Sequence, residues 1–88
     1  MSWMVYMLRC ADNSIYTGIT TNLERRVAEH NNDNRKGARY TRARRPVTLA
    51  YQEACKDRSQ ASKREYELKR LSHSDKVSLL SSSLEGAN

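Results

Sequence analysis

A small group of polar residues combines side-chain types that could together act on a phosphodiester. The group holds two tyrosines, an arginine, a histidine and a carboxylate: Tyr6, Tyr16, Arg26, His30 and Glu65. The carboxylate could hold a hard divalent cation such as Mg²⁺, which keeps most of its waters and contacts a phosphate oxygen. The arginine could clamp the phosphate and neutralise charge that develops at phosphorus. A tyrosine or the histidine could take a proton from the attacking water, directly or through a relay.

Each of these residues also has a structural interpretation. A half-buried tyrosine on a strand usually packs, and the histidine could bond at the C-terminal end of its helix, where the dipole favours it. Arg26 could pair with Glu29 or Asp33. Glu65 could pair with Lys69, four residues further along. The convergence of several inward-facing polar groups is what favours a functional interpretation.

The elements that must position these residues begin with a predicted β-hairpin over residues 4–18. A two-residue loop over Asp12 and Asn13 would place the two tyrosines on opposite faces of the hairpin. A three-residue loop that also takes in the preceding alanine, with Asn13 left-handed, would place both rings on one face, with Gly18 opposite Tyr6. Functional tyrosines require the second register.

Residues 22–31 are predicted to form a helix because Thr21-x-x-Glu24 has the capping-box form. Two polar residues share the helix face that must pack on the sheet, because helix phase gathers Leu23, Arg26, Val27 and His30 on one side. Arg25 points elsewhere and is the ordinary solvated arginine.

A third strand is predicted over residues 47–53, after Pro46, with Val47, Leu49 and Tyr51 on one face.

A second main helix is predicted over residues 59–71, capped by Asp57 or Ser59. Its apolar side carries Glu65 among Ala61, Leu68 and Leu71, whereas Glu67 lies at the edge of that stripe or beyond it. Ser72-x-x-Asp75 repeats the capping-box form and predicts a last helix through about Leu80.

Residues 35–45 carry six cations and no acid, and form at most a short helix over residues 38–44. Such a segment could be a solvated, poorly ordered loop. We favour contacts to a nucleic-acid backbone, with Tyr40 available to stack on a base. The predicted contacts are Arg35, Lys36, Arg39, Tyr40, Thr41, Arg42, Arg44 and Arg45. Phosphate contacts carry no direct sequence information, so we predict little base specificity.

Composition sets the outer limits. The chain has 88 residues, a net charge of +6 and a pI near 9.7, which favours a polyanionic partner, nucleic acid before a membrane surface. Cys10 and Cys55 are isolated, so a zinc site or a disulfide is not expected. There is no long apolar run and no secretion signal, so we expect a cytoplasmic protein with no membrane partner and no small-molecule cofactor. We expect one domain over residues 1–80 and a polar tail over 81–88.

Several motifs together resemble one family. Val5-Tyr6-Met7 and Tyr16-Thr17-Gly18 resemble the paired signature of the GIY-YIG nuclease superfamily, and residues 20–30 resemble its helix with the catalytic arginine and histidine. Residues 37–42 and 57–69 are similar to the small stand-alone bacterial branch, which is related to the N-terminal domain of an excision-repair nuclease. The resemblance implies an α+β fold, a three-stranded antiparallel sheet flanked by helices.

The resemblance also implies roles. Glu65 would hold one divalent metal, Mg²⁺ or Mn²⁺, and Arg26 would contact the scissile phosphate. Tyr6, with Tyr16 or His30, would activate the water. The expected function is a metal-dependent endonuclease acting on DNA in repair or recombination; the alternative is a non-catalytic nucleic-acid-binding module of the same fold. No sequence feature supports docking on a larger repair protein.

The chain departs from the family pattern in several places. Val5, Met7 and Thr17 replace the usual glycine and two isoleucines of the signatures. A late asparagine used by some relatives has no counterpart, and neither does the separate DNA-recognition domain of most relatives. Low sequence specificity is expected for this reason.

Overall fold

The computed structural model describes residues 2–86. In these residues a three-stranded antiparallel sheet is flanked by four helices, which confirms the predicted α+β fold. The elements are β1 (Trp3–Arg9), β2 (Ile15–Thr20), α1 (Leu23–Asn32), α2 (Arg39–Arg42), β3 (Thr48–Cys55), α3 (Arg58–Lys69) and α4 (His73–Gly86). The strand order is β2-β1-β3, so β1 lies at the centre of the sheet.

The hairpin of β1 and β2 has the three-residue loop. Tyr6 pairs with Gly18, and Tyr16 pairs with Leu8. Asn13 adopts a φ of 68°, the left-handed conformation that asparagine tolerates better than most residues. Because side chains alternate along a strand, this register places both tyrosine rings on one face of the sheet.

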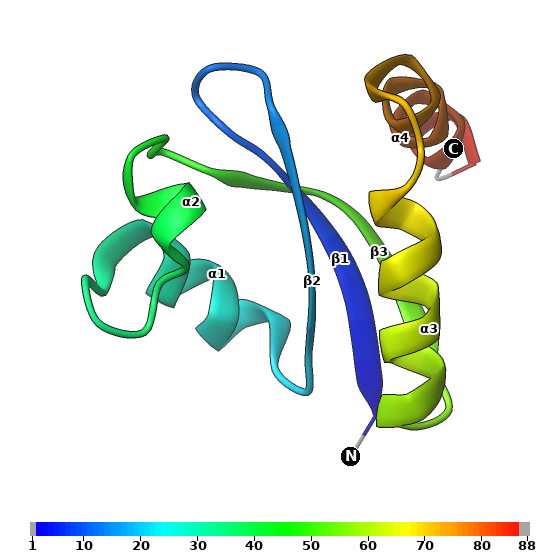
Figure 1. The fold of residues 1–88 in the computed structure, drawn as a ribbon, viewed down its shortest axis with the longest axis horizontal. Helices are drawn as coiled ribbons and strands as arrows, with labels where there is room; N and C mark the ends of the chain where they lie inside the picture. Colours follow the sequence, from blue (N-terminus) through cyan, green and yellow to red (C-terminus); the bar gives the residue numbers. More distant parts are fainter. Residues whose placement is uncertain (1, 87–88) are drawn as a thin grey trace.

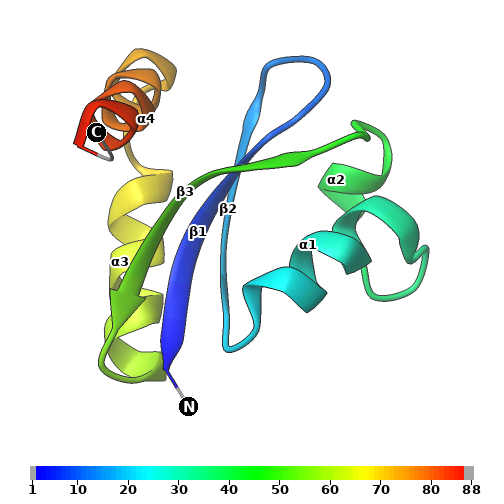
Figure 2. The same cartoon turned by 180° about the vertical axis from the view of Figure 1, so that it is seen from behind.

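The sheet separates two groups of helices (Figures 1 and 2). Helices α1 and α2 lie on one side, and α3 and α4 lie on the other. The cluster on the α1 side consists of Tyr6, Leu8, Cys10 and Val47, with Tyr16, Leu23 and Val27 packed against it. The cluster on the α3 side consists of Val5, Met7, Cys55, Ala61, Leu68 and Leu80. The central strand therefore sends alternate residues into two separate cores.

The side chains along strand β3 do not lie on the faces of the sheet that the sequence predicts. Tyr51 pairs with Met7, but Leu49 pairs with the very next residue of β1, so Ala50 is the extra residue of a β-bulge. The predicted common face of Val47, Leu49 and Tyr51 is wrong because the bulge reverses the alternation between them. Tyr51 packs against the cluster on the α3 side, whereas Val47 belongs to the cluster on the α1 side.

The N-terminus of α1 is capped one residue later than predicted. The side chain of Asn22 accepts a hydrogen bond from the Arg25 N–H at 3.0 Å, so Asn22 and not Thr21 is the cap. Both residue types are good caps, and sequence alone does not separate neighbours of this kind. Asp57 caps α3, one of the two predicted alternatives.

Helix α4 begins where the sequence predicts but ends later. The Ser72 hydroxyl accepts from the Asp75 N–H at 3.1 Å, which confirms the predicted start. The helix then continues to Gly86, past the end predicted near Leu80, and residues 87–88 of the predicted tail lie outside the described residues. None of the described helices is long and apolar enough to cross a membrane.

Candidate active site

Tyr6 lies in the core on the α1 side of the sheet, where it is 1% exposed. Its partner across the hairpin is Gly18. A Cβ atom at Gly18 would lie 2.5 Å from Tyr6 Oη and 2.7 Å from Tyr6 Cζ, closer than any side chain could approach without moving the ring. Glycine is therefore required here to leave space for the tyrosine hydroxyl.

His30 joins this hydroxyl to α2. The histidine is 0% exposed, its Nε2 lies 2.8 Å from Tyr6 Oη, and its Nδ1 lies 2.8 Å from Thr41 Oγ1. Tyr16 packs edge-on against the imidazole, with the ring centroids 5.1 Å apart. The histidine side chain therefore bonds to the sheet and to α2, and not merely at the end of its own helix.

Burial keeps both members of the Tyr6–His30 pair uncharged at neutral pH. It raises the pKa of Tyr6 to about 12; the nearby Arg26 guanidinium lowers this pKa, and electrostatic interactions with Tyr16 and Glu65 add to the rise. Burial also lowers the pKa of His30 to about 4, and the positive charge of Arg26 lowers it further. At pH 7 the tyrosine therefore keeps its proton, and one imidazole nitrogen is a free acceptor.

Arg26 lies at the rim of this cluster. Its side chain is 25% exposed, whereas that of Arg25 is 62% exposed, as helix phase predicts. Its Nη1 donates to Glu29 at 3.1 Å and to the Lys36 carbonyl at 2.6 Å. Burial opposes its charge, but interactions with Glu29 and Tyr6 outweigh burial and raise its pKa. The ion pair expected from a structural interpretation is present, and the same guanidinium also acts on the tyrosine.

Glu65 approaches from α3, on the other side of the sheet (Figure 1). Its side chain is 24% exposed, whereas that of Glu67 is 51% exposed, again as helix phase predicts. Its Oε2 lies 3.2 Å from Lys69 Nζ, the pair expected from a structural interpretation. Its charge helps to raise the pKa of Tyr6, so the carboxylate lies within electrostatic reach of the tyrosine.

The structure thus brings four of the five predicted residues into one contact network and leaves the fifth at its edge. Tyr6, Tyr16, Arg26 and His30 are linked by hydrogen bonds, ring contacts and charge. Glu65 is linked to them only through its charge, and its bonded partner is Lys69.

The donor set limits which metal this site could take. The described residues contain no group of three or more His, Cys, Asp or Glu side chains that could hold a metal ion. A single carboxylate does not fit a structural zinc site, which needs four protein ligands. It does fit Mg²⁺, which is commonly held by one or two carboxylates, several waters and a substrate phosphate.

The basic segment is folded and not a poorly ordered loop. The Asp33 carboxylate accepts from the backbone N–H groups of Arg35 and Lys36, both at 2.8 Å. Arg42 Nη1 donates to the Asn34 carbonyl at 2.7 Å. These bonds, together with the bond from Arg26 to the Lys36 carbonyl, fix the segment to the end of α1.

Two predicted nucleic-acid contacts turn inward. Thr41 is 0% exposed and lies against His30, so its prediction as a nucleic-acid contact is wrong. Arg45 donates to the His30 carbonyl at 2.7 Å, to Asn34 Oδ1 at 2.9 Å and to the Asp33 carbonyl at 3.1 Å. Arg45 therefore satisfies the His30 carbonyl in the last turn of α1, which has no partner within the helix, and ties down the two residues that follow the helix.

Tyr40 and Arg44 are already engaged with each other. The Arg44 guanidinium lies 3.9 Å from the centroid of the Tyr40 ring and donates to Asp12 at 3.1 Å. Tyr40 also stacks with Tyr16, with centroids 5.9 Å apart and an interplanar angle of 28°. A base that stacks on Tyr40 would have to compete with these neighbours. The exposed cations of the segment are Arg35, Lys36, Arg39 and Arg42.

The contact that sequence reasoning missed is the one between Thr41 and His30. The signal for it is weak but present: α2 reads Arg-Tyr-Thr-Arg, and Thr41 is its only short, uncharged side chain. A helix turn that packs on a protein must bury something, and Thr41 is the residue that can be buried at least cost.

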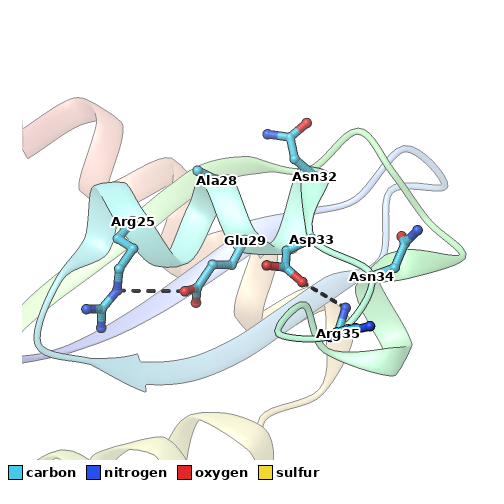
Figure 3. A pocket seen from close by; sticks show the side chains of 7 residues that line it. All are labelled: Arg25, Ala28, Glu29, Asn32, Asp33, Asn34 and Arg35. Atoms are coloured by element: carbon cyan, nitrogen blue, oxygen red, sulfur yellow. Dashed lines mark hydrogen bonds and ion pairs between the residues drawn. The ribbon is translucent and has the colours of Figure 1, made fainter.

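A hollow of about 540 Å³ lies beside α1, away from these catalytic candidates. Figure 3 shows its lining, which runs along α1 from its first turn to its end and into the loop that follows. The residues are Arg25, Ala28, Glu29, Asn32, Asp33, Asn34 and Arg35. Its polar groups largely bond to one another, as Arg25 does to Glu29 at 3.8 Å and the Arg35 N–H does to Asp33 at 2.8 Å. The predicted catalytic residues are not part of it.

The sheet, the paired tyrosines and the helix with arginine and histidine define a small α+β domain of nuclease type. Residues 2–78 match the GIY-YIG catalytic domain, and the chain belongs to that family.

The curated relatives carry the name UPF0213 protein. One from Desulfotalea psychrophila is 58% identical over 85 residues, covering 97% of this chain and 76% of its own length. One from Halobacterium salinarum is 49% identical over 75 residues, covering 85% of this chain and 95% of its own length. The first relative extends beyond the region that the two chains share.

Two solved structures are similar in fold. The solution NMR structure of the UPF0213 protein BH0048 from Bacillus halodurans is 43% identical, with a TM-score of 0.58, and covers 92% of this chain and 84% of its own. The solution NMR structure of the protein EF2693 from E. faecalis is 40% identical, with a TM-score of 0.62, and covers 96% and 88%.

Proposed function

We propose that this protein is a metal-dependent endonuclease that hydrolyses DNA phosphodiester bonds with low sequence specificity. The observation that carries the proposal is the buried contact of 2.8 Å between Tyr6 Oη and His30 Nε2, beside the partly exposed Arg26. A hydroxyl, a neutral imidazole and a cation placed together supply a proton path next to a phosphate-binding group.

In the proposed reaction, water attacks phosphorus; a new P–O bond forms, and the P–O bond to the leaving oxygen breaks. A water proton passes to Tyr6 Oη as the tyrosine proton passes to His30 Nε2, and the leaving oxygen takes a proton from solvent. Arg26 donates to a non-bridging oxygen. A phosphate bound there offsets the positive charge that helps to lower the pKa of His30, so the substrate itself makes the imidazole a better acceptor.

Glu65 is the residue that would hold the divalent cation, Mg²⁺ or Mn²⁺. When bound, the cation would supply charge stabilisation to the phosphate oxygens. Binding requires Glu65 to exchange Lys69 for the cation. That exchange is feasible because an exposed i,i+4 ion pair contributes only about 0.3–0.5 kcal/mol.

The exposed cations of the basic segment would bind the DNA backbone. Arg35 and Lys36 project from the loop after α1, and Arg39 and Arg42 project from α2. Hydrogen bonds hold this segment against the end of α1, the helix that carries Arg26. Backbone contacts would orient the strand without reading its sequence. The proposed location is the cytosol, which two buried cysteines that are both free thiols support. The proposed process, DNA repair or recombination, rests on the GIY-YIG family alone.

A cleavage assay tests the proposal. Nicked, branched and linear DNA, with an RNA control, are incubated with Mg²⁺, Mn²⁺ or EDTA. We expect metal-dependent products that Arg26→Ala and Glu65→Ala each reduce at least about 100-fold. The chain offers matched controls in Arg25→Ala and Glu67→Ala, which remove more exposed residues of the same types from the same helices. Full activity in Arg26→Ala or Glu65→Ala would contradict the assigned site.

A non-catalytic nucleic-acid-binding module is the second candidate. It is favoured by the ion pairs of Arg26 with Glu29 and of Glu65 with Lys69, which occupy the two charged groups that the reaction needs. DNA binding that is lost in Arg39→Ala and Arg42→Ala, with no product under any metal condition, would support this candidate over the enzyme.

A further inference from the structure

Thr41 is a fully buried polar residue on a four-residue helix whose other members are arginines and an exposed tyrosine. Its Oγ1 lies 2.8 Å from His30 Nδ1 and 2.9 Å from the Ala38 carbonyl. The opposite nitrogen of the same imidazole lies 2.8 Å from Tyr6 Oη. A continuous chain of short contacts therefore runs from Tyr6 through His30 and Thr41 to the backbone.

The carbonyl at the end of this chain decides where the protons lie. A carbonyl can only accept, so the Thr41 hydroxyl donates to Ala38 and must accept from His30 Nδ1. The Nδ1 atom then carries the imidazole hydrogen, and Nε2 is left to accept from Tyr6.

The opposite assignment is poorer. With hydrogen on Nε2, that nitrogen would donate to Tyr6 Oη, and Nδ1 would accept from the Thr41 hydroxyl and from the Ala38 N–H at 3.4 Å. That contact is longer than the roughly 2.7–3.2 Å that is usual for a hydrogen bond from an N–H group. The bond from Thr41 to the Ala38 carbonyl at 2.9 Å would be lost in exchange.

We propose that Thr41 is a positioning residue that holds His30 with its hydrogen on Nδ1, so that Nε2 faces Tyr6 as the proton acceptor. The effect of Thr41 on catalysis rests on the proposed function. The orientation of the imidazole itself is independent of that function and can be measured without substrate. The low pKa of His30 supports the inference, since the neutral imidazole has a single hydrogen to place.

The first test is ¹⁵N NMR of the imidazoles in the unaltered protein at pH 7. The chain contains only two histidines, His30 and the exposed His73, so His73→Gln assigns the spectrum. We expect His30 to be protonated on Nδ1, with a hydrogen bond at each nitrogen, and His73 to show the averaged pattern of a solvated ring. Protonation of His30 on Nε2 would overturn the proposal, whatever the cleavage assay shows.

The second test compares Thr41→Val, which keeps the shape of the side chain, with Thr41→Ser, which keeps the hydroxyl. We expect Thr41→Val to shift the His30 hydrogen toward Nε2 and to reduce kcat about 10- to 100-fold with KM little changed. Thr41→Ser should restore both readouts. An Nδ1 hydrogen that persists in folded Thr41→Val would overturn the proposal. If that variant does not fold, Thr41→Ala against Thr41→Ser gives the same comparison.

The two tests separate this inference from the proposed function. A protein without nuclease activity whose His30 carries the Nδ1 hydrogen, lost in Thr41→Val, would refute the enzyme and keep the positioning role. An active enzyme in which Thr41→Val has full kcat would keep the proposed function and refute the role of Thr41 in catalysis.

Discussion

The interior and the rim of the candidate site are built differently. In the interior, Tyr6 and His30 are at most 1% exposed and are bonded to each other at 2.8 Å. At the rim, Arg26 and Glu65 are 25% and 24% exposed and hold partners on their own helices. Buried pairs are costly to rearrange, whereas exposed ion pairs contribute little and exchange easily. The proposed proton path is therefore set by the fold, and the charged groups are left able to exchange their partners for the proposed substrate.

The largest effect should come from the interior. Tyr6→Phe keeps the ring and removes the hydroxyl, so the cleavage rate should fall about 10²- to 10⁴-fold. The free energy of unfolding should fall by about 1–3 kcal/mol, since the buried His30 Nε2 is left without its hydrogen-bond donor. Single-turnover cleavage and urea denaturation measure the two quantities. Tyr51→Phe, which removes a hydroxyl bonded to Glu53 on the other side of the sheet, is the control. If Tyr6→Phe and Tyr51→Phe lowered the cleavage rate equally, the Tyr6 hydroxyl would have no special role in cleavage.

A smaller effect is expected in the pH dependence of stability. The folded pKa of His30 is about 4 and its ordinary value is 6.5, so between these pH values the unfolded chain takes up a proton that the folded protein does not. The free energy of unfolding should therefore be unaffected above pH 6.5 and fall toward pH 4, by at most about 3 kcal/mol at 1.36 kcal/mol per pKa unit.

Urea titrations from pH 4 to pH 7 measure this loss. His30→Gln should flatten the profile between about pH 5 and pH 6.5. Hydrogen bonds hold the pKa of the Asp12 and Asp33 carboxyls below its usual 3.8, so the stability that these groups contribute is lost only below about pH 5. That part of the slope should remain in His30→Gln. If the free energy of unfolding falls as steeply with pH in His30→Gln as in the unaltered protein, groups other than His30 cause the loss.

The smallest effect should appear at the outer surface. Arg39→Ala and Arg42→Ala should each lower the slope of log K against log salt for DNA binding by about 0.9, the value for one phosphate contact. Arg45→Ala should instead lower the free energy of unfolding, because its three bonds go to the His30 carbonyl of α1 and to two acceptors directly after the helix. Fluorescence anisotropy at several salt concentrations checks the first statement, and thermal unfolding checks the second. If the salt slope dropped only in Arg45→Ala, Arg45 and not Arg39 or Arg42 would be the residue that contacts DNA.

Patterns with a clear local cause were predictable from the sequence. The hairpin register follows from two residues, since Asn13 tolerates the left-handed turn and Gly18 leaves space opposite Tyr6. Helix phase separates Arg26 from Arg25 because α1 spans nearly three turns, enough to define a buried face.

Features that depend on tertiary packing were not predictable. Helix α2 has four residues, too few for periodicity to show that Thr41 points inward while its neighbours face solvent. The bulge at Ala50 has no glycine or proline to mark it, so regular alternation was the natural expectation for β3. Arg45 resembles the other cations of its segment in sequence and differs only in the acceptors it meets.

The bulge has a consequence for α3. Beyond Ala50, the strand turns Tyr51 and Glu53 toward α3, where Glu53 accepts from Arg64 Nε at 3.1 Å. Arg64 directly precedes Glu65, so this ion pair links β3 to the turn of α3 that carries the proposed metal ligand. Removing one residue from the middle of β3 would reverse the alternation, turn Glu53 away from α3 and break that link, even though β3 itself contributes none of the predicted catalytic side chains.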